Sequence, residues 1–416
     1  MDREALEVLR AAGRGLGGIV QLGCRGAGAR DALRRLVRMR SGRALPPSRI
    51  GEIQYGILTG PGGHVDEVLV AWTDHGAELN CHGGTASALA ALKLLSEHGF
   101  REVGEEAWWR PLAERGEIPW TEYEARRLVP EAATPLQARL VAHGLCFAAR
   151  VRRLFDLVDE DSRAAHNVLT EWIDAFAPAS RILKRHVVAI AGAPNVGKST
   201  CFNALLALDR ALVSSLPGTT RDAVRHPARL GGLAVELVDT AGLWDTAKGP
   251  DAEAVSRAQK IVREANLCLF LLDGGRPLSD EDRSAWAACA RRVDPSAPGP
   301  GLLVVAMNKA DLPPVLTDEA CQDAGIGKAD IRFSALGDVE PLRDLLGRRL
   351  WAFGTGLVKK NAFRPWEGSI PMGAFTLRQH DLLCEGREHL ERGDPKACQR
   401  CLARILSGPK GECPQR

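Results

Sequence analysis

Gly192-Ala-Pro-Asn-Val-Gly-Lys-Ser-Thr200 comes directly after the apolar run His186-Val-Val-Ala-Ile-Ala191. This pattern is typical of a strand that leads into a phosphate-binding loop, with a helix beginning near Lys198. The two glycines of the loop let the backbone curl, so that successive N–H groups face one chain of phosphates. Lys198 adds a positive charge near the β- and γ-phosphates, the Ser199 hydroxyl can bind Mg²⁺, and the helix dipole favours the same anion. The stretch therefore predicts a nucleotide-binding α/β domain.

Two more strand ends carry the polar residues that such a site needs. Asp239-Thr-Ala-Gly242 closes the apolar run 234–238, and its aspartate can hold the water shell of the metal. The glycine N–H can approach a γ-phosphate closely because glycine has no Cβ. Asn308-Lys-Ala-Asp311 follows the apolar run 301–307. The Asp311 carboxylate only accepts hydrogen bonds, so it suits the donors on the guanine edge and repels the N1 acceptor of adenine.

The two remaining elements lie between and after these strands. Pro217-Gly-Thr-Thr-Arg-Asp222 is rich in turn-forming residues, and its Thr220 hydroxyl is available as a second Mg²⁺ ligand. Ser334-Ala-Leu336 follows the short strand-like run 331–333 and offers a backbone N–H to the O6 of guanine. Five elements in this order, over about 145 residues, predict a GTPase. The predicted nucleotide-binding residues are Asn195, Val196, Gly197, Lys198, Ser199, Thr200, Ser214, Ser215, Leu216, Pro217, Gly218, Thr219, Thr220, Asp239, Thr240, Ala241, Gly242, Asn308, Lys309, Asp311, Ser334, Ala335 and Leu336.

Length and composition limit the classes of protein that remain. The 416 residues are enough for two to three domains with buried cores. The net charge of +3 is too small to indicate a nucleic-acid partner by itself, and the basic residues are dispersed. No run approaches the roughly 18 apolar residues of a membrane span, and the charged N-terminus does not resemble a signal peptide, so we expect a cytoplasmic protein. Eleven scattered cysteines fit reduced thiols rather than a disulfide framework.

The pattern of elements predicts an α/β plus α architecture in four parts. Residues 1–104 mix short strands with Gly-rich turns and predict an α+β domain. Residues 105–183 repeat apolar positions every three or four residues and predict helices. Residues 184–353 alternate strand and helix and predict a Ras-like, doubly wound and mostly parallel sheet. Residues 354–416 end in another helical stretch, which either packs with 105–183 around an inserted GTPase domain or forms an independent segment.

In many GTPases a glutamine directly after the motif at 239–242 orients the attacking water. Here that position is Leu243, which has no hydrogen-bonding group in its side chain. The catalytic charge must then come from a partner's arginine, a different side chain or a cation. The amide oxygen of Asn195 can help to bind a monovalent cation at the β- and γ-phosphates, or Asn195 simply suits the unusual φ and ψ of the loop. Asp251 and Glu253 either orient the water through bridging solvent or are surface charges. The predicted catalytic residues are Lys198, Asn195 and Asp251.

Four motifs, at 192–199, 218–222, 239–243 and 308–311, resemble those of one family of GTPases. This part of the chain is similar to the tRNA modification GTPases of the MnmE (TrmE) family and to their relatives Era and Der. Two stretches outside it narrow the resemblance to MnmE. Glu78-Leu-Asn-Cys-His-Gly-Gly84 resembles the E-L-x-x-H-G-G block of the family's folate-binding N-terminal domain, and Gly13-Arg-Gly-Leu-Gly-Gly-Ile-Val20 resembles its opening strand.

The resemblance implies a homodimer, formed through the N-terminal domain, that works with an FAD-containing MnmG-like partner. Together the two proteins would add a carboxymethylaminomethyl-type group to the wobble uridine of tRNA, with K⁺-stimulated GTP hydrolysis. It also implies a folate contact at Glu78 and a water-orienting role at Asp251, where the family has a glutamate. The implied metal ligands are Ser199 and Thr220 for Mg²⁺, and Asn195, Ser214, the Leu216 carbonyl and Thr219 for K⁺.

Three departures from the family pattern keep an alternative open. Gln21 stands where the family has a folate-binding arginine, and the family's lysine-containing stretch is not recognisable at 109–127. Cys413 lies near the C-terminus without the family's complete terminal cysteine motif. The alternative is a GTP-dependent switch or assembly factor of the Era/Der type that does not modify tRNA.

Two further residue groups have ordinary explanations. Cys398 and Cys401, with Cys413, could suggest a metal site, but they fall in a helical pattern without a second paired motif or a nearby histidine. His82 precedes two glycines, and we expect it to be a turn residue rather than a ligand or an acid–base group.

Overall fold

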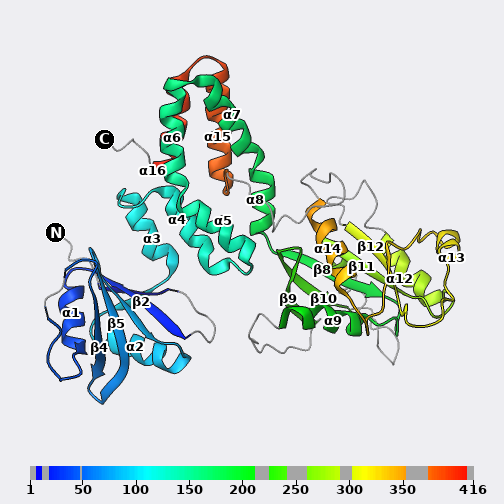
Figure 1. Cartoon of the computed structure of the whole chain (residues 1–416), viewed down its shortest axis with the longest axis horizontal. Coiled ribbons are helices and arrows are strands. Elements are labelled where there is room, and N and C mark those ends of the chain that lie inside the picture. Colours follow the sequence, from blue (N-terminus) through cyan, green and yellow to red (C-terminus); the bar gives the residue numbers. More distant parts are fainter. Residues whose placement is uncertain are drawn as a thin grey trace. The chain divides into compact units, whose positions relative to one another are not determined.

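The structure is a computed structural model, and two compact units can be recognised in it. It describes residues 6–11, 18–46, 49–210, 224–240, 260–290, 302–352 and 373–409. The first unit consists of Met1–Glu131 with Ala403–Arg416, and the second consists of Ala132–Leu402. Each unit contains one of the two sheets that are drawn in Figure 1.

The first unit contains a seven-stranded sheet with the order β3-β4-β5-β6-β2-β1-β7. Neighbouring strands are antiparallel except for β1 and β7, which are parallel. Two helices, α1 (Ala29–Leu36) and α2 (Thr85–Glu97), contribute to its core. The strands are β1 Glu7–Ala11, β2 Ile19–Arg25, β3 Val37–Arg38, β4 Ile53–Gly60, β5 Gly63–Thr73, β6 Gly76–His82 and β7 Arg101–Val103.

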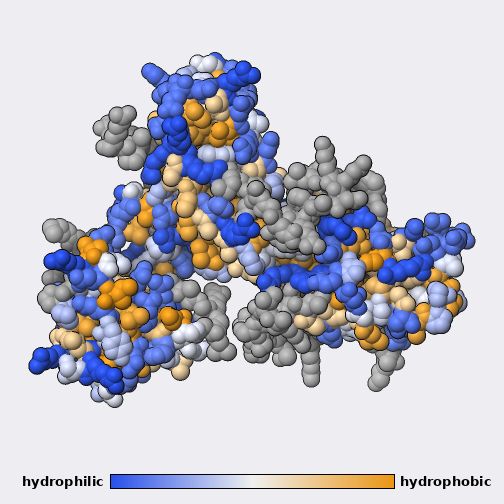
Figure 2. Space-filling model, in the orientation of Figure 1, coloured by the Kyte–Doolittle hydropathy of each residue, from blue (hydrophilic) through white to orange (hydrophobic). Residues whose placement is uncertain are grey.

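Side chains alternate along β4 and β5, so this sheet has one covered and one uncovered face. Val68 and Trp72 are buried in a core that they share with apolar residues of α1 and α2. Ile53, Tyr55 and Leu69 point to the opposite face and are 67%, 45% and 44% exposed. Figure 2 shows apolar residues on the visible surface of this unit. A group of exposed apolar side chains on a sheet is typical of an interaction surface.

Short helices follow β7 and belong to the same unit: α3 (Glu105–Glu114), α4 (Trp120–Leu128) and the 3₁₀ turn Val129–Glu131. Trp120 and Tyr123 of α4 pack against Ala113 of α3. Gly408, just after the last helix, lies directly against the Trp120 ring, where a Cβ would collide with it. The C-terminal end of the described chain therefore packs on α4.

Helices from both ends of the second unit pack together. The helices before its sheet are α5 (Pro135–Leu145), α6 (Phe147–Glu160), α7 (Ser162–Asp174) and α8 (Phe176–Leu183). Those after it are α15 (Leu377–Glu391) and the part of α16 (Pro395–Ser407) up to Leu402. Figure 1 shows α15 beside α7. His166 Nε2 lies 3.0 Å from Glu391 Oε1, and Gln399 Nε2 donates to Asp159 Oδ2 at 2.8 Å. Segments more than 200 residues apart thus form one helical bundle.

The second sheet is the mostly parallel sheet that the sequence predicts within 184–353. Its order is β13-β12-β11-β8-β10-β9, and only β9 is antiparallel to its neighbour. Its strands are β8 His186–Gly192, β9 Val224–Leu230, β10 Leu233–Asp239, β11 Leu267–Asp273, β12 Leu302–Asn308 and β13 Ile331–Arg332. Its helices are α9 Lys198–Arg210, α12 Asp280–Ala290, α13 Asp318–Asp323 and α14 Glu340–Ala352. Since neighbouring parallel strands point the same way, the C-terminal ends of β8, β10, β11 and β12 meet at one edge.

Arg181 of α8 lies at both connections between the bundle and this sheet. Its Nη1 donates to the carbonyl of Leu350 in α14 at 3.2 Å. Its own carbonyl oxygen lies 3.0 Å from Nε2 of His186, the first residue of β8. The start and the end of the sheet domain are therefore held close together. Among the helices that the structure describes, none has the length and apolar character needed to cross a membrane.

Candidate functional site

The loop after β8 has the curled backbone that the sequence predicts. Gly192 and Gly197 have φ values of 145° and 95°, which favour glycine. A Cβ at Gly192 would lie 2.5 Å from the Leu271 carbonyl oxygen, and one at Gly197 would collide with the Asn308 amide. Asn195 has a φ of 64°, a left-handed conformation that asparagine tolerates better than most residues. Both glycines are therefore required by geometry as well as by the motif.

The charge of Lys198 lies inside this loop. The residue begins α9 and is only 3% exposed. Its Nζ donates to the carbonyl of Ala193 at 2.8 Å and to that of Gly192 at 3.1 Å. Ser199 and Thr200 follow in the first turn of the helix and are exposed. The loop thus offers an ammonium group, accessible hydroxyls and a helix N-terminus within two residues of one another, as phosphate binding requires.

The end of β10 is fixed next to the base of the loop. Asp239 pairs with Ile190 in the parallel register of β10 and β8, and it is 8% exposed. The fully buried Thr240 donates from Oγ1 to the Ile190 carbonyl at 2.7 Å. The Asp239 carboxylate and the Ser199 hydroxyl are hard oxygen donors of the kind that Mg²⁺ prefers, so these two residues fit a magnesium site.

Asn308 joins the phosphate loop to the predicted guanine-binding segment. The side chain is 2% exposed, and its Nδ2 donates to the Val196 carbonyl in the loop at 2.8 Å. Its Oδ1 accepts from the backbone N–H of Ala335 at 2.9 Å. The Leu336 N–H donates to Ser334 Oγ at a longer 3.3 Å. The sequence singles out Asn308 only as part of its motif, and this bridging position is a finding of the structure.

The next motif residues face the same edge. Asp311 is exposed, and a hydrogen bond from Ser334 lowers the pKa of its carboxyl, with smaller effects from its own backbone N–H and the charge of Lys309. It is therefore an ionised acceptor at neutral pH. Lys309 Nζ donates to Oδ2 of Asp273, at the end of β11, at 2.7 Å. Sequence reasoning missed Asp273, although an acidic residue that ends a buried strand is the same signal that identifies Asp239.

Several predicted site residues lie outside the residues that the structure describes. The second Mg²⁺ ligand, three of the four K⁺ ligands and the candidate water-orienting residue thus remain predictions. So does any role of Cys413. These site residues are Ser214, Ser215, Leu216, Pro217, Gly218, Thr219, Thr220, Ala241, Gly242 and Asp251.

The residues singled out in the first unit interact with one another. Gln21 Nε2 donates to Glu78 Oε2 at 2.6 Å, between the neighbouring strands β2 and β6. His82 is the last residue of β6 rather than a turn residue, so that expectation is wrong. Its Nδ1 lies 2.6 Å from Oδ1 of the buried Asp66, and its backbone N–H donates to Oδ2 at 2.9 Å. The hydrogen bond with Asp66, followed by the charge of that residue, raises the pKa of His82.

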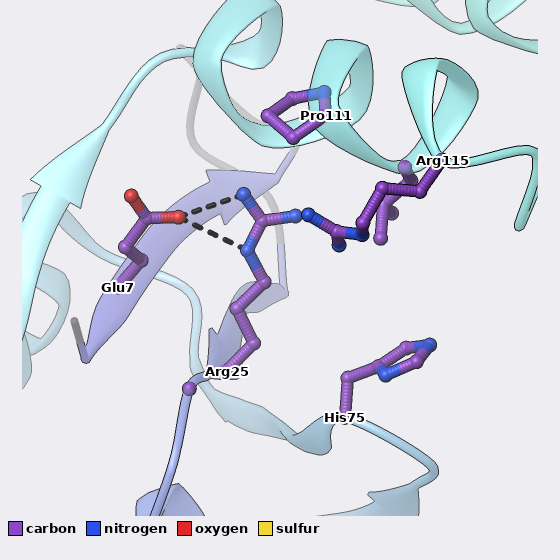
Figure 3. A pocket seen from close by; sticks show the side chains of 7 residues that line it. Glu7, Arg25, His75, Pro111 and Arg115 are labelled. Carbon is purple, nitrogen blue, oxygen red and sulfur yellow. Dashed lines mark hydrogen bonds and ion pairs between the residues drawn. The ribbon is translucent and has the colours of Figure 1, made fainter. Parts of the chain in front are cut away.

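A cavity of about 180 Å³ in the first unit is lined by charged groups (Figure 3). Arg25 dominates it: Nε and Nη2 donate to Glu7 Oε2 at 3.0 and 2.7 Å, and Nη1 donates to the Trp108 carbonyl at 2.5 Å. The Arg25 guanidinium also lies 4.2 Å from the centre of the Trp108 ring. The arginine therefore connects the first sheet to α3.

The curled loop, the buried lysine, the acidic strand ends and the Asn308 bridge define a P-loop GTPase. Residues 187–309 match the 50S ribosome-binding GTPase family. The chain is 32% identical to the tRNA modification GTPase MnmE of Syntrophobacter fumaroxidans over 80% of its own length and 79% of that protein. The MnmE of Phenylobacterium zucineum is 30% identical, with coverages of 83% and 81%. The chain therefore belongs to the MnmE family of tRNA modification GTPases, as its motifs predict, and it is a GTP-hydrolysing enzyme.

One of the solved structures to which the chain is similar is that of Era. A crystal structure of Era with MgGDPNP and a segment of 16S ribosomal RNA matches 49% of this chain and 64% of that chain. The sequence identity is 26% and the TM-score is 0.32.

Proposed function

We propose that this GTPase modifies the wobble uridine of tRNA, adding a carboxymethylaminomethyl-type group together with an FAD-containing, MnmG-like partner. The observation that carries the proposal is the extent of the match to MnmE. It covers about four fifths of both proteins and thus reaches well beyond the nucleotide-binding sheet. A shared GTPase domain alone would give a match to only part of the chain.

The site residues have separate roles in binding and hydrolysis. Lys198 contacts the β- and γ-phosphates, and the ionised Asp311 accepts the hydrogen bonds of guanine. The Leu336 N–H makes a hydrogen bond of 3.3 Å to Ser334 Oγ, and it is the donor for the guanine O6. Ser199 and Thr220 would hold Mg²⁺, which would neutralise charge on the phosphate oxygens. Asn195, Ser214, the Leu216 carbonyl and Thr219 would hold K⁺, and Asp251 would orient the attacking water.

The proposed architecture is a GTPase domain, 184–353, inserted in the sequence between the helical parts 105–183 and 354–416. The α+β domain 1–104 precedes them in the sequence. The bundle contacts of His166 with Glu391 and of Gln399 with Asp159 support the insertion. The uncovered face of the first sheet, with its exposed Ile53, supports a homodimer formed through the N-terminal domain.

The second candidate function is a GTP-dependent switch that does not modify tRNA. The hydrogen bond between Gln21 and Glu78 favours it. Gln21 replaces a folate-binding arginine of the family, and it occupies one oxygen of the carboxylate that we predicted to contact folate. A folate donor bound at Glu78 would have to compete with this bond or use the other carboxylate oxygen.

The discriminating experiment is to delete the gene and analyse the nucleosides of bulk tRNA by mass spectrometry. The first function predicts that the modified wobble uridine disappears and that the wild-type gene restores it, while Lys198→Ala does not. Unchanged nucleosides in the deletion strain would refute tRNA modification and favour the switch. A parallel titration with guanosine and adenosine nucleotides tests the site itself, and equal affinities would refute the assignment of Asp311.

A further inference from the structure

The last two described helices bring together three side chains of types that can bind a metal ion. Glu385 and His389 are four residues apart on α15, so both lie on one face of that helix. His389 Nε2 is 3.9 Å from Glu385 Oε1. Cys401 of α16 faces them, and its Sγ, a carboxylate oxygen and a ring nitrogen all lie within 4.8 Å of one another. The expectation that no histidine lies near this cysteine is therefore wrong.

The close approach of the two helices has a clear cause. The connection between α15 and α16 is only 392–394, and the Asp394 N–H donates to the His389 carbonyl at 2.9 Å. Gly386, buried on α15, leaves room for both cysteines of α16. A Cβ placed there would lie 3.5 Å from the Cβ of Cys401 and 3.6 Å from the Sγ of Cys398. Both distances are ordinary van der Waals contacts, so an alanine would fit at 386, and only a longer side chain would push the thiols away from α15.

The chemistry of this set of three donors is that of a zinc site. A thiolate, an imidazole and a carboxylate are the three side-chain ligands that Zn²⁺ uses, whereas Mg²⁺ and Ca²⁺ require oxygen ligands. Bonds of about 2.0 to 2.3 Å in a tetrahedron separate ligand atoms by roughly 3.3 to 3.8 Å. The distance of 3.9 Å between His389 and Glu385 is close to this range, and ligand atoms that are up to 4.8 Å apart must approach each other by at most about 1.5 Å.

The three side chains differ in how far they are exposed to solvent. Cys401 is 2% exposed, whereas the side chains of His389 and Glu385 are 30% and 45% exposed. An ion can therefore reach the site from solvent past the carboxylate and the imidazole. Because the cysteine belongs to α16 and the other two residues to α15, one ion bound by all three would link the two helices.

We propose that Glu385, His389 and Cys401 bind one Zn²⁺ ion, with water as the fourth ligand, and that the ion fastens α15 to α16. The site does not depend on GTP or on tRNA modification. Since it exists only when the two helices pack, binding of the ion stabilises the folded bundle.

The test uses the full-length, reduced and metal-free protein titrated with Co²⁺ as a spectroscopic substitute for zinc. Wild type is expected to develop a thiolate-to-cobalt absorption band, which the all-oxygen Mg²⁺ site of a GTPase cannot produce. Competition with Zn²⁺ should abolish the band. Cys401→Ser should lack it, whereas Cys398→Ser, which changes a buried thiol one turn away, should keep it.

Two partly exposed substitutions keep the test decisive if Cys401→Ser does not fold. Removing a residue that only hydrogen-bonds to a metal ligand weakens metal binding about 10- to 100-fold. Glu385 and His389 are proposed as ligands themselves, so Glu385→Gln and His389→Gln should each weaken zinc binding by at least that factor. Zinc should raise the Tm of wild type and not that of the variant that combines Glu385→Gln with His389→Gln. No band in wild type, a band that persists in Cys401→Ser, or a band lost in Cys398→Ser would each overturn the proposal.

Discussion

Asn308→Ala would remove the side chain that joins the phosphate loop to the guanine-binding segment. The Val196 carbonyl and the Ala335 N–H, both in buried residues, would lose their partners. Leaving a buried polar group unsatisfied costs about 1 to 3 kcal/mol, so the two together cost about 2 to 6 kcal/mol. The lower part of this range is expected, because the vacated space lets the loop relax.

The effect on nucleotide affinity follows from that figure. The nucleotide binds only when the loop and the 334–336 segment have the arrangement that Asn308 holds in wild type. In the variant, part of the binding free energy must be used to restore that arrangement. A cost of about 2 kcal/mol corresponds to a Kd for GTP at least about thirtyfold weaker. We would measure Kd by titration with a fluorescent guanosine nucleotide, and folding by circular dichroism.

Asn266→Ala is the matched control. Its Oδ1 accepts from the Val187 N–H at 2.7 Å, at the opposite end of the same sheet, so the same substitution there should lower stability without changing Kd. The reasoning would be refuted if Asn308→Ala bound GTP within about twofold of wild type, or if both variants lost affinity equally.

Three other outcomes are expected. Lys198→Ala should abolish GTP hydrolysis in a phosphate-release assay, because it removes the charge inside the loop; turnover like that of wild type would contradict the site. Exchanging KCl for NaCl should slow hydrolysis several-fold in wild type and not in Asn195→Ala, whereas equal wild-type rates in both salts would contradict a potassium-selective site at Asn195. The pairing of His82 with Asp66 raises the pKa of His82 above its ordinary 6.5, so it should stabilise the fold fully below about pH 6 and progressively less as the pH rises through the raised pKa. Urea unfolding of His82→Gln should lack this decline, and a wild-type decline retained in the variant would argue against the pair.

The parts of the fold and site that could be predicted from sequence are those encoded by nearby residues. Gly192, Gly197 and Lys198 lie within one short motif, and the buried strands of the second sheet are apolar runs, so their positions follow from local spacing. The acidic residues at strand ends follow in the same way, because neighbouring parallel strands bring their ends to one edge.

The interactions that could not be predicted join residues distant in sequence. Asn308 bonds to a carbonyl 112 residues before it, and Lys309 to Asp273, 36 residues before it. Spacing carries no information about such pairs, which depend on how strands are ordered. Likewise, Cys401 meets His389 only because the connection between two helices is short and Gly386 leaves space, which the pattern of cysteines alone does not reveal.

The two bonds of Arg181 have an energetic consequence for the helical bundle. The bond from its Nη1 to the carbonyl of Leu350 brings together two points of the chain that are 169 residues apart. While the domain between them is folded, the bundle is closed through a connection of about 26 residues, 351–376, and the entropic cost of closing it is about 2 kcal/mol below that of a disordered connection of the full length. Melting of the GTPase domain would restore that cost, so the melting temperatures of the two parts are linked through chain entropy as well as through the direct contacts between them.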